Sequence, residues 1–190
     1  NKIITTGEGG MCLTNDPELA EKMKILRDHG MNPKRRYWHE VVGFNYRMTN
    51  LQAALGVAQL KKIDYFISRK RKIAETYNSL FEGVEAVIRP PEMPWAKNVY
   101  WLYSVLIDHS KTNTDRDKLM EMLSKKGIET RPLFYPIHEM PPYRNYSQGR
   151  CPVAERLSRI GLSLPSSAKL TGEEIEFIAN TVVKSLQASI

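Results

Sequence analysis

Three helix-start signatures divide this 190-residue chain and restrict the folds that it can adopt. Each is a threonine followed three residues later by a side chain that can cap the same helix: Thr49-x-x-Gln52, Thr114-x-x-Asp117 and Thr171-x-x-Glu174. After the last one, apolar residues recur in the clearest amphipathic pattern of the sequence: Ile175, Ile178, Ala179, Val182, Val183 and Leu186. Short apolar runs typical of strands alternate with these helices. The sequence therefore predicts an α/β fold.

The N-terminal part is expected to contain two strands, two helices and an ordered loop. A glycine-rich turn separates the strands, and Asp16-Pro17 caps and begins the first helix. The second helix begins after Thr49 and bends on its way to about Phe81. The expected ranges are strands over 1–6 and 10–14, a helix from 17 that stops before Gly30, a loop over 31–47 and a long helix over 51–82.

The C-terminal part is expected to form a small α/β domain. Leu119, Met120 and Leu123 give its first helix an inward face, and Gly127 ends that helix. The expected ranges are strands over 84–89, 101–107 and 128–131, a Pro- and Tyr-rich loop over 132–152 and a last helix after Thr171. The predicted domains are 1–50, a connecting helix over 51–82, and 83–190.

Composition narrows the functional class. The net charge is +7 and the pI is about 9.4, which raises nucleic acid as a partner. No recognition motif supports this, and the basic run 69–72 is expected to be a solvated helix face. Anionic substrates explain the charge as well. No apolar run reaches the length of a membrane span, and Cys12 and Cys151 do not form a disulfide framework, so we expect a reducing cytoplasm.

Lys2 is the candidate reactive amine. It precedes a β-branched run and the glycine-rich turn 5–10, where the backbone can approach a ligand closely. A lysine reacts with a carbonyl only when its proton is removed or its pKa is lowered, and an ordinary exposed lysine is the alternative. A phosphate-cradling loop is the other alternative, but no helix begins directly after the glycines and no G-K-[ST] follows.

Two other segments can hold anions or sugars. Asn45 and Arg47 stand just before a helix start, which suits a phosphate, although a turn role and a surface ion pair are equally open. Arg131, Tyr135 and His138 lie on a proline-stiffened loop that could bind a sugar ring and a diphosphate; the alternative is that its aromatic residues cover the core. We predict no metal site, because the histidines lack metal-ligand spacing.

Together these segments resemble the DegT/DnrJ/EryC1/StrS aminotransferase family, which has the type I fold of pyridoxal 5'-phosphate (PLP) enzymes. The matching stretches occur in the family's order and span nearly the whole chain: NKIITTGEGGM, LRDHGM, GFNYRMTNLQAALGVAQLKKID, GIETRPLFYPIHEMPPY and LPSS followed by LTGEEI. The resemblance implies the C-terminal portion of that fold, with a small α/β C-terminal domain.

The resemblance also implies residue roles. Lys2 matches the lysine that binds PLP covalently, and because related dehydratases have His there, lysine favours amino transfer. Asn45 matches a residue that reaches the PLP phosphate of the neighbouring subunit, with Arg47 assisting, which implies a homodimer with shared active sites. Arg131, Tyr135 and His138 match a segment that lines the nucleotide-sugar site.

The implied reaction moves an amino group from L-glutamate to a 4-keto-6-deoxy nucleotide sugar, giving a 4-amino sugar for surface polysaccharide. In the family, the acidic partner of the PLP ring nitrogen precedes the lysine. We therefore expect this chain to be part of a longer enzyme and inactive alone. The alternative is a non-catalytic dimerisation or binding module, which a longer upstream reading frame with a Gly-rich segment would exclude.

Overall fold

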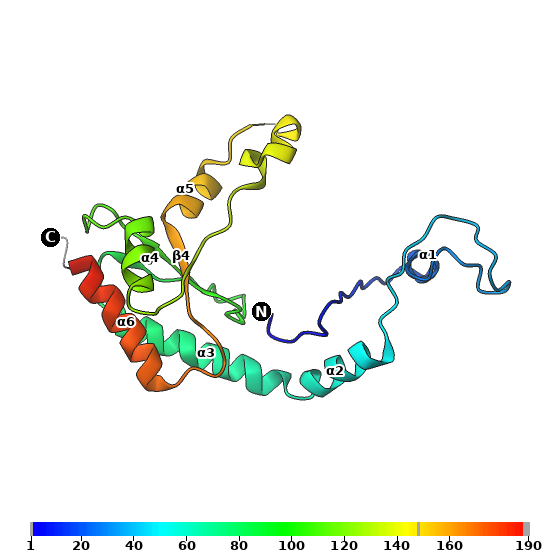
Figure 1. Ribbon diagram of the computed structural model, residues 1–190, viewed down its shortest axis with the longest axis horizontal. Helices are drawn as coiled ribbons and strands as arrows, with labels where there is room; N and C mark the ends of the chain where they lie inside the picture. The colour runs from blue at the N-terminus through cyan, green and yellow to red at the C-terminus, as the bar shows by residue number, and fades with distance from the viewer. Residues whose placement is uncertain (1, 148, 188–190) are drawn as a thin grey trace. The chain divides into compact units, whose positions relative to one another are not determined.

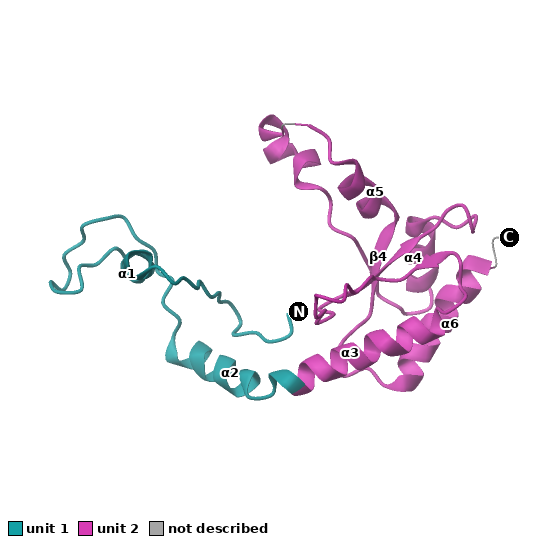
Figure 2. Cartoon of the chain, turned by 180° about the vertical axis from the view of Figure 1, so that it is seen from behind, with its two compact units in different colours: residues 1–64 teal, residues 65–190 magenta. Residues whose placement is uncertain are grey.

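The computed structural model describes residues 2–147 and 149–187, and the chain divides into two compact units. Unit 1 is Asn1–Asp64 and unit 2 is Tyr65–Ile190 (Figure 2). The boundary between the two units follows Asp64, whereas the predicted domain boundaries follow residues 50 and 82. The predicted domains stay a prediction about the longer enzyme. Each unit is described below by itself.

Unit 1 contains the two expected helices, labelled in Figure 1. Helix α1 spans Pro17–Arg27. The Asp16 side chain caps it by accepting hydrogen bonds from the backbone N–H groups of Glu18 and Leu19. Helix α2 spans Asn50–Leu60 and begins with the predicted Thr49–Gln52 capping box. The long helix expected as far as about Phe81 is instead two helices, because two turn residues after α2 separate it from α3, Ile63–Leu80.

The two strands predicted around the glycine-rich turn are not formed: residues 2–6 and 10–14 have no strand. A strand requires a neighbouring main chain, and here a side chain takes that place. The Thr5 N–H donates to Gln59 Oε1 at 3.1 Å, and Gln59 Nε2 donates to the Thr5 carbonyl. The prediction of strands from the β-branched residues is therefore wrong here, and Ile3 and Ile4 lie in a bend.

The predicted ordered loop 31–47 is present, and the backbones of Gly30 and Gly43 cross in close contact at its base. We call this contact the glycine crossing. Gly30 has a φ of +71°, and a Cβ added to Gly43 would lie 2.0 Å from the Gly30 nitrogen. Isolated bridges join Asp28 to Asn45 and Met31 to His39. Only glycine permits this contact, so both positions fix the path of the loop.

Unit 2 is built on a four-stranded antiparallel sheet in the order β1-β2-β4-β3. The strands are β1 Val87–Ile88, β2 Tyr103–Ile107, β3 Arg131–Pro132 and β4 Gly161–Leu164. The first two lie inside the predicted ranges, but only the first residue of β3 falls within 128–131. Sequence analysis missed β4, although it is fully buried and pairs with β2 in the register Tyr103↔Leu164 and Val105↔Leu162.

The helices of unit 2 cover this sheet. Helix α4, Arg116–Ser124, is capped by Asp115, one residue after the predicted Thr114, which is buried. Leu119 and Leu123 face the core as predicted. Helix α6, Gly172–Gln187, keeps the predicted capping box, with Thr171 and Glu174 exchanging bonds of 2.8 and 3.2 Å. Helix α5, Pro152–Ile160, lies beyond the expected loop, which instead contains the 3-10 helices η1, Ile137–Glu139, and η2, Pro141–Tyr146.

Only part of the basic run 69–72 on α3 is the solvated face that the sequence predicts: Lys72 is exposed, but Lys70 and Arg71 are engaged within the unit. Lys70 is 8% exposed, and its ammonium donates to the Trp101 carbonyl at 2.8 Å and to the Ser166 carbonyl. Arg71 makes a two-pronged contact with Glu92, at 2.7 and 3.1 Å. Burial lowers the pKa of Lys70 from 10.5 to about 8. These cations stabilise the unit internally, so the run does not indicate a nucleic-acid surface.

Two further sequence expectations concern environment. Cys12 and Cys151 are both exposed and unbonded to each other. Among the described residues, no helix combines the length and apolar character needed to cross a bilayer.

Candidate active site

The lysine segment of unit 1 lies along helix α2. Gln52, at the start of the helix, donates to the Glu8 carbonyl at 3.4 Å, whereas Gln59, near its end, pairs with Thr5. The segment therefore runs antiparallel to α2, so the chain before Thr5 lies toward the C-terminal end of the helix, as the course of the blue trace shows (Figure 1). The Lys2 side chain is exposed.

The glycine-rich turn after the lysine is tight, as predicted. Thr6 Oγ1 donates to the Glu8 carbonyl at 2.6 Å, and Gly7 has a φ of +86°. A Cβ on Gly9 would lie 2.5 Å from Thr6 Oγ1. The turn thus fixes the backbone path of residues 6–9 beside the start of α2.

Asn45 and Arg47 stand at the opposite end of α2, just before its capping box. Arg47 Nη1 lies 3.2 Å from Asp28 Oδ2, so the ion pair that the sequence left open is present. The Arg47 side chain is 66% exposed, and an exposed pair of this kind contributes little stability. The guanidinium can therefore exchange Asp28 for a phosphate at small cost.

The structure does not bring Lys2 together with Asn45 and Arg47 in one chain. Helix α2 has 11 residues and is therefore about 16 Å long, and it separates the two groups. A single copy offers an amine at one end of α2 and anion donors at the other.

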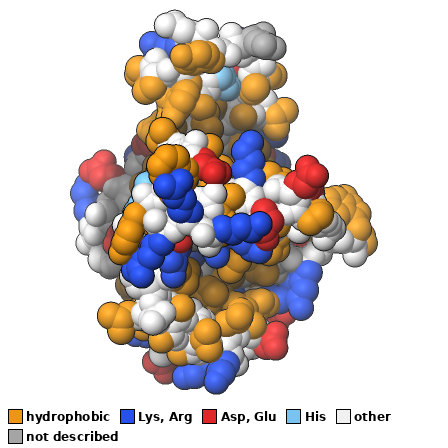
Figure 3. Space-filling model, turned by 90° about the vertical axis from the view of Figure 1, so that its right-hand side faces the viewer, with side chains coloured by type: hydrophobic (Ala, Val, Ile, Leu, Met, Phe, Trp, Pro, Cys, Tyr) orange, Lys and Arg blue, Asp and Glu red, His pale blue; other side chains and the backbone are white. Residues whose placement is uncertain are grey.

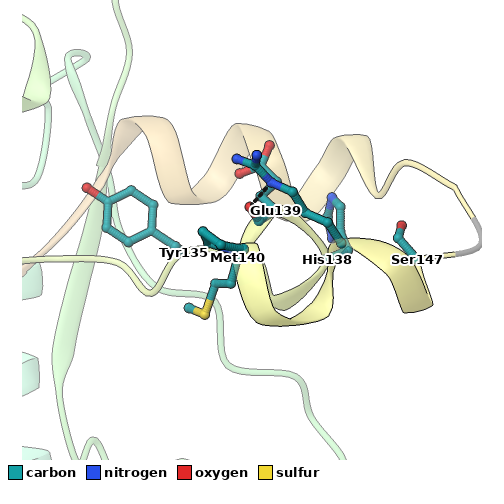
Figure 4. Close-up of a pocket in the computed structure, with 7 residues that line it drawn as sticks. Tyr135, His138, Glu139, Met140 and Ser147 are labelled. Atoms are coloured by element: carbon teal, nitrogen blue, oxygen red, sulfur yellow. Dashed lines mark hydrogen bonds between the residues drawn. The ribbon is translucent and has the colours of Figure 1, made fainter.

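In unit 2, Tyr135 and His138 line one pocket of about 730 Å³ (Figure 4). Its other lining residues are Glu139, Met140, Pro141, Arg144 and Ser147. Tyr135 is 61% exposed and the adjacent Phe134 is also exposed, so these rings do not cover the core of the unit. Arg131 is not among the lining residues; its Nη2 lies 3.5 Å from Glu129 Oε1.

Glu155 is a site residue that sequence analysis missed. It is 5% exposed on α5, and its Oε1 lies 3.2 Å from His138 Nε2 while Arg150 pairs with both carboxylate oxygens. The hydrogen bond from Arg150, helped by that from His138, lowers the pKa of Glu155 from 4.5 to about 2. No spacing rule links residues 17 apart on a loop and a helix, so the sequence carried no signal for this pair.

His138, Glu139 and Glu155 also lie close enough together to hold a cation, with ligand atoms within 4.8 Å. Arg150 already places a positive charge on Glu155. We therefore assign no metal to this group.

The fold is the C-terminal portion of a type I PLP-dependent transferase, as predicted, because solved sugar aminotransferases align with nearly the whole chain. Over 98% of the chain, the aminotransferase TlmJ from Streptoalloteichus hindustanus aligns with a TM-score of 0.88 at 30% identity. PseC from Helicobacter pylori, involved in pseudoaminic acid biosynthesis, aligns over 92% with a TM-score of 0.84, also at 30% identity. The chain covers 50% and 48% of these two proteins.

The chain belongs to the DegT/DnrJ/EryC1/StrS aminotransferase family, whose model matches residues 1–183. Among curated relatives, GDP-perosamine synthase of Caulobacter vibrioides is 44% identical over 93% of the chain, and that of Escherichia coli O157:H7 is 43% identical over 96%. The chain spans about half the length of these relatives, 47% and 48%.

The residues present fit a PLP cofactor. By residue type, Lys2 would offer a primary amine to the aldehyde and Asn45 and Arg47 would offer donors to the phosphate, although one copy holds the two sets at opposite ends of α2.

Proposed function

We propose that this chain forms part of a PLP-dependent nucleotide-sugar aminotransferase of the GDP-perosamine type. The reaction moves an amino group from L-glutamate to a 4-keto-6-deoxy nucleotide sugar, and the 4-amino sugar serves surface polysaccharide synthesis. The similarity to GDP-perosamine synthases supports the substrate class.

The observation that carries the proposal is that the lysine segment and the residues Asn45 and Arg47 lie at opposite ends of α2. An amine at one end and phosphate donors at the other cannot serve one cofactor in one copy, because about 16 Å of helix separates them. Two copies arranged antiparallel would bring the Lys2 of one copy to the Asn45 and Arg47 of the other. This arrangement supports a homodimer with shared active sites.

Each residue then has a defined task. PLP supplies the electron-withdrawing ring that makes a proton next to nitrogen removable. The Lys2 amine anchors the cofactor and, once released, moves a proton between the two carbon atoms on either side of the transferred nitrogen. Asn45 and Arg47 hold the phosphate, and Tyr135 and His138 orient the nucleotide sugar from the pocket that they line, while Arg131 contributes from outside that lining.

We also propose that the 190-residue chain alone does not catalyse this reaction. Among residues 2–64 only Gly30 is buried, so unit 1 lacks a core that would hold its backbone in a fixed catalytic geometry. The competing function is a non-catalytic dimerisation module, in which Lys2 would not react at all.

Reduction with borohydride in the presence of PLP, followed by peptide mapping, tests the proposal. The expected result is a pyridoxyl adduct on Lys2 that is lost in Lys2→Arg, with Lys24→Arg as the matched control. Labelling spread evenly over the surface lysines would overturn the cofactor role of Lys2. Full aminotransferase activity in the isolated chain would overturn the expected inactivity.

A further inference from the structure

The pocket segment, residues 138–147, is fixed near both of its ends by one carboxylate. His138 opens the segment and Arg150 follows it, and both side chains bond to Glu155 on α5. Inside the segment, Arg144 Nε donates to the Glu139 carbonyl at 2.9 Å, the dashed contact in Figure 4. Apart from His138 and the half-buried Met140, the residues of the segment are exposed, and the bond from His138 to Glu155 attaches the segment to α5.

The contact with Glu155 also decides the state of the His138 ring. An ionised carboxylate only accepts hydrogen bonds, and Glu155 stays ionised because its pKa lies at about 2. The proton on a neutral His138 ring must therefore sit on Nε2, which lies 3.2 Å from Glu155. Nδ1 is then an acceptor, the ring nitrogen that Glu155 does not engage.

We propose that Glu155 is a positioning residue: it holds His138 as the Nε2–H tautomer and pins the pocket segment, so that Nδ1 accepts a hydrogen bond from a sugar hydroxyl. The ligand part of this inference rests on the proposed function, since it takes the pocket to bind a nucleotide sugar. The positioning part does not, because it concerns the ring and the segment alone.

Side-chain NMR on the full 190-residue chain tests the positioning. Long-range nitrogen–proton spectra of the His138 ring should show the Nε2–H tautomer in the wild type. Glu155→Gln should lose that preference, since an amide can also donate, and should speed hydrogen exchange in residues 140–147 by about tenfold, the effect of losing a charged hydrogen bond. Glu176→Gln, an exposed carboxylate on α6, is the control.

Binding of GDP-mannose and of GDP as probes tests the ligand part. The wild type should bind GDP-mannose more tightly than GDP, and Glu155→Gln should lose about tenfold of affinity for GDP-mannose alone. If the wild type does not bind GDP-mannose, both the proposed function and the proposed hydrogen bond to a sugar hydroxyl fail. The role of Glu155 in holding His138 is still tested by the tautomer that the NMR spectra show.

An unchanged His138 tautomer and unchanged exchange in folded Glu155→Gln would overturn the positioning. Should Glu155→Gln fail to fold, Glu155→Asp replaces it, because the shorter acid keeps the charge but loses the reach to His138. Wild-type spectra in Glu155→Asp would overturn the inference equally.

Discussion

Units 1 and 2 differ most in what they bury. The described part of unit 2 encloses twenty hydrophobic residues, among them Tyr77, Tyr103 and Leu162, each with no measurable exposure. Unit 1 has no such cluster among residues 2–64, and its Leu13 and Leu51 are more than 80% exposed. Figure 3 shows hydrophobic side chains open to solvent on one face of the molecule. Unit 2 is held by burial, whereas caps, glycine contacts and a side-chain amide shape unit 1.

The unit that has the hydrophobic core is therefore not the unit that carries the proposed cofactor residues. The cofactor residues proposed here lie on the unit without a core, and exposed apolar surface of that extent marks an interaction face. The proposed sugar residues lie on the unit that has its own core. Substitutions should therefore act globally in unit 2 and locally in unit 1.

The largest expected effect is on the core of unit 2. Leu162→Ala on strand β4, which lies inside the sheet, should lower the free energy of unfolding by about 2–5 kcal/mol, because it leaves a cavity in the hydrophobic core. Leu13→Ala in unit 1 should change it by less than about 0.5 kcal/mol. Urea unfolding followed by circular dichroism measures both, and equal effects would break the comparison.

Lys70→Met should have the next largest effect. It keeps the buried stem but leaves the carbonyls of Trp101 and Ser166 without their donor, at a cost of about 1–3 kcal/mol. Lys72→Met, two residues along the same basic run and 70% exposed, should be nearly neutral in the same urea experiment. If both variants behaved alike, the run would be the solvated face after all.

The difference in unfolding free energy between the wild type and Lys70→Met should also depend on pH. The pKa of Lys70 is about 8 in the folded chain against 10.5 when unperturbed, so the unfolded state binds more protons between these values. Stability contributed by Lys70 should therefore rise from pH 8 to 10.5 and be lost as pH falls through 8. The gap between wild type and Lys70→Met should follow that trend; a gap independent of pH would contradict the lowered pKa.

A smaller, local effect is expected at the glycine crossing of unit 1. Gly43→Ala places a Cβ 2.0 Å from the Gly30 nitrogen, and overpacking of this kind costs about 1–3 kcal/mol locally. Protease cleavage within residues 31–42 should accelerate several-fold while the unfolding of unit 2 is unchanged. Gly10→Ala, with open space around it, should leave cleavage as it is.

The smallest effect should follow loss of the Gln59 amide. Gln59→Leu removes both bonds to Thr5, each worth about 1 kcal/mol, and should speed hydrogen exchange of the Thr5 amide. Gln59→Glu keeps the acceptor and should be intermediate. Exchange as slow as in the wild type would show that Gln59 does not hold the lysine segment.

Local signals in the sequence predicted the starts of α1, α2 and α6, whereas α5, Pro152–Ile160, was missed. The boxes at Thr49 and Thr171 and the periodicity of α6 are contained within a few residues, so no tertiary information was needed. The box at Thr114 was displaced by one residue, because Thr112 and Thr114 bond to the end of α6 and leave the cap to Asp115.

Elements defined by distant partners were not predicted. Strand β4, Gly161–Leu164, has no β-branched residue and only four positions, too few for the alternation of Leu162 and Leu164 to mark it, and its neighbours on both sides make it a strand. Residues 2–6 have the β-branched composition but no neighbouring strand. For the same reason, the sequence predicted His138 as a candidate but gave no sign of Glu155.

The antiparallel course of the lysine segment along α2 has a genetic consequence. If two copies complete each other's sites, a subunit with Lys2→Arg and a subunit with Asn45→Ala are each defective in a different half. Mixing them would rebuild one intact site in each heterodimer and leave the other with both defects. Two separately inactive alleles would then complement each other, to at most half of the activity per heterodimer.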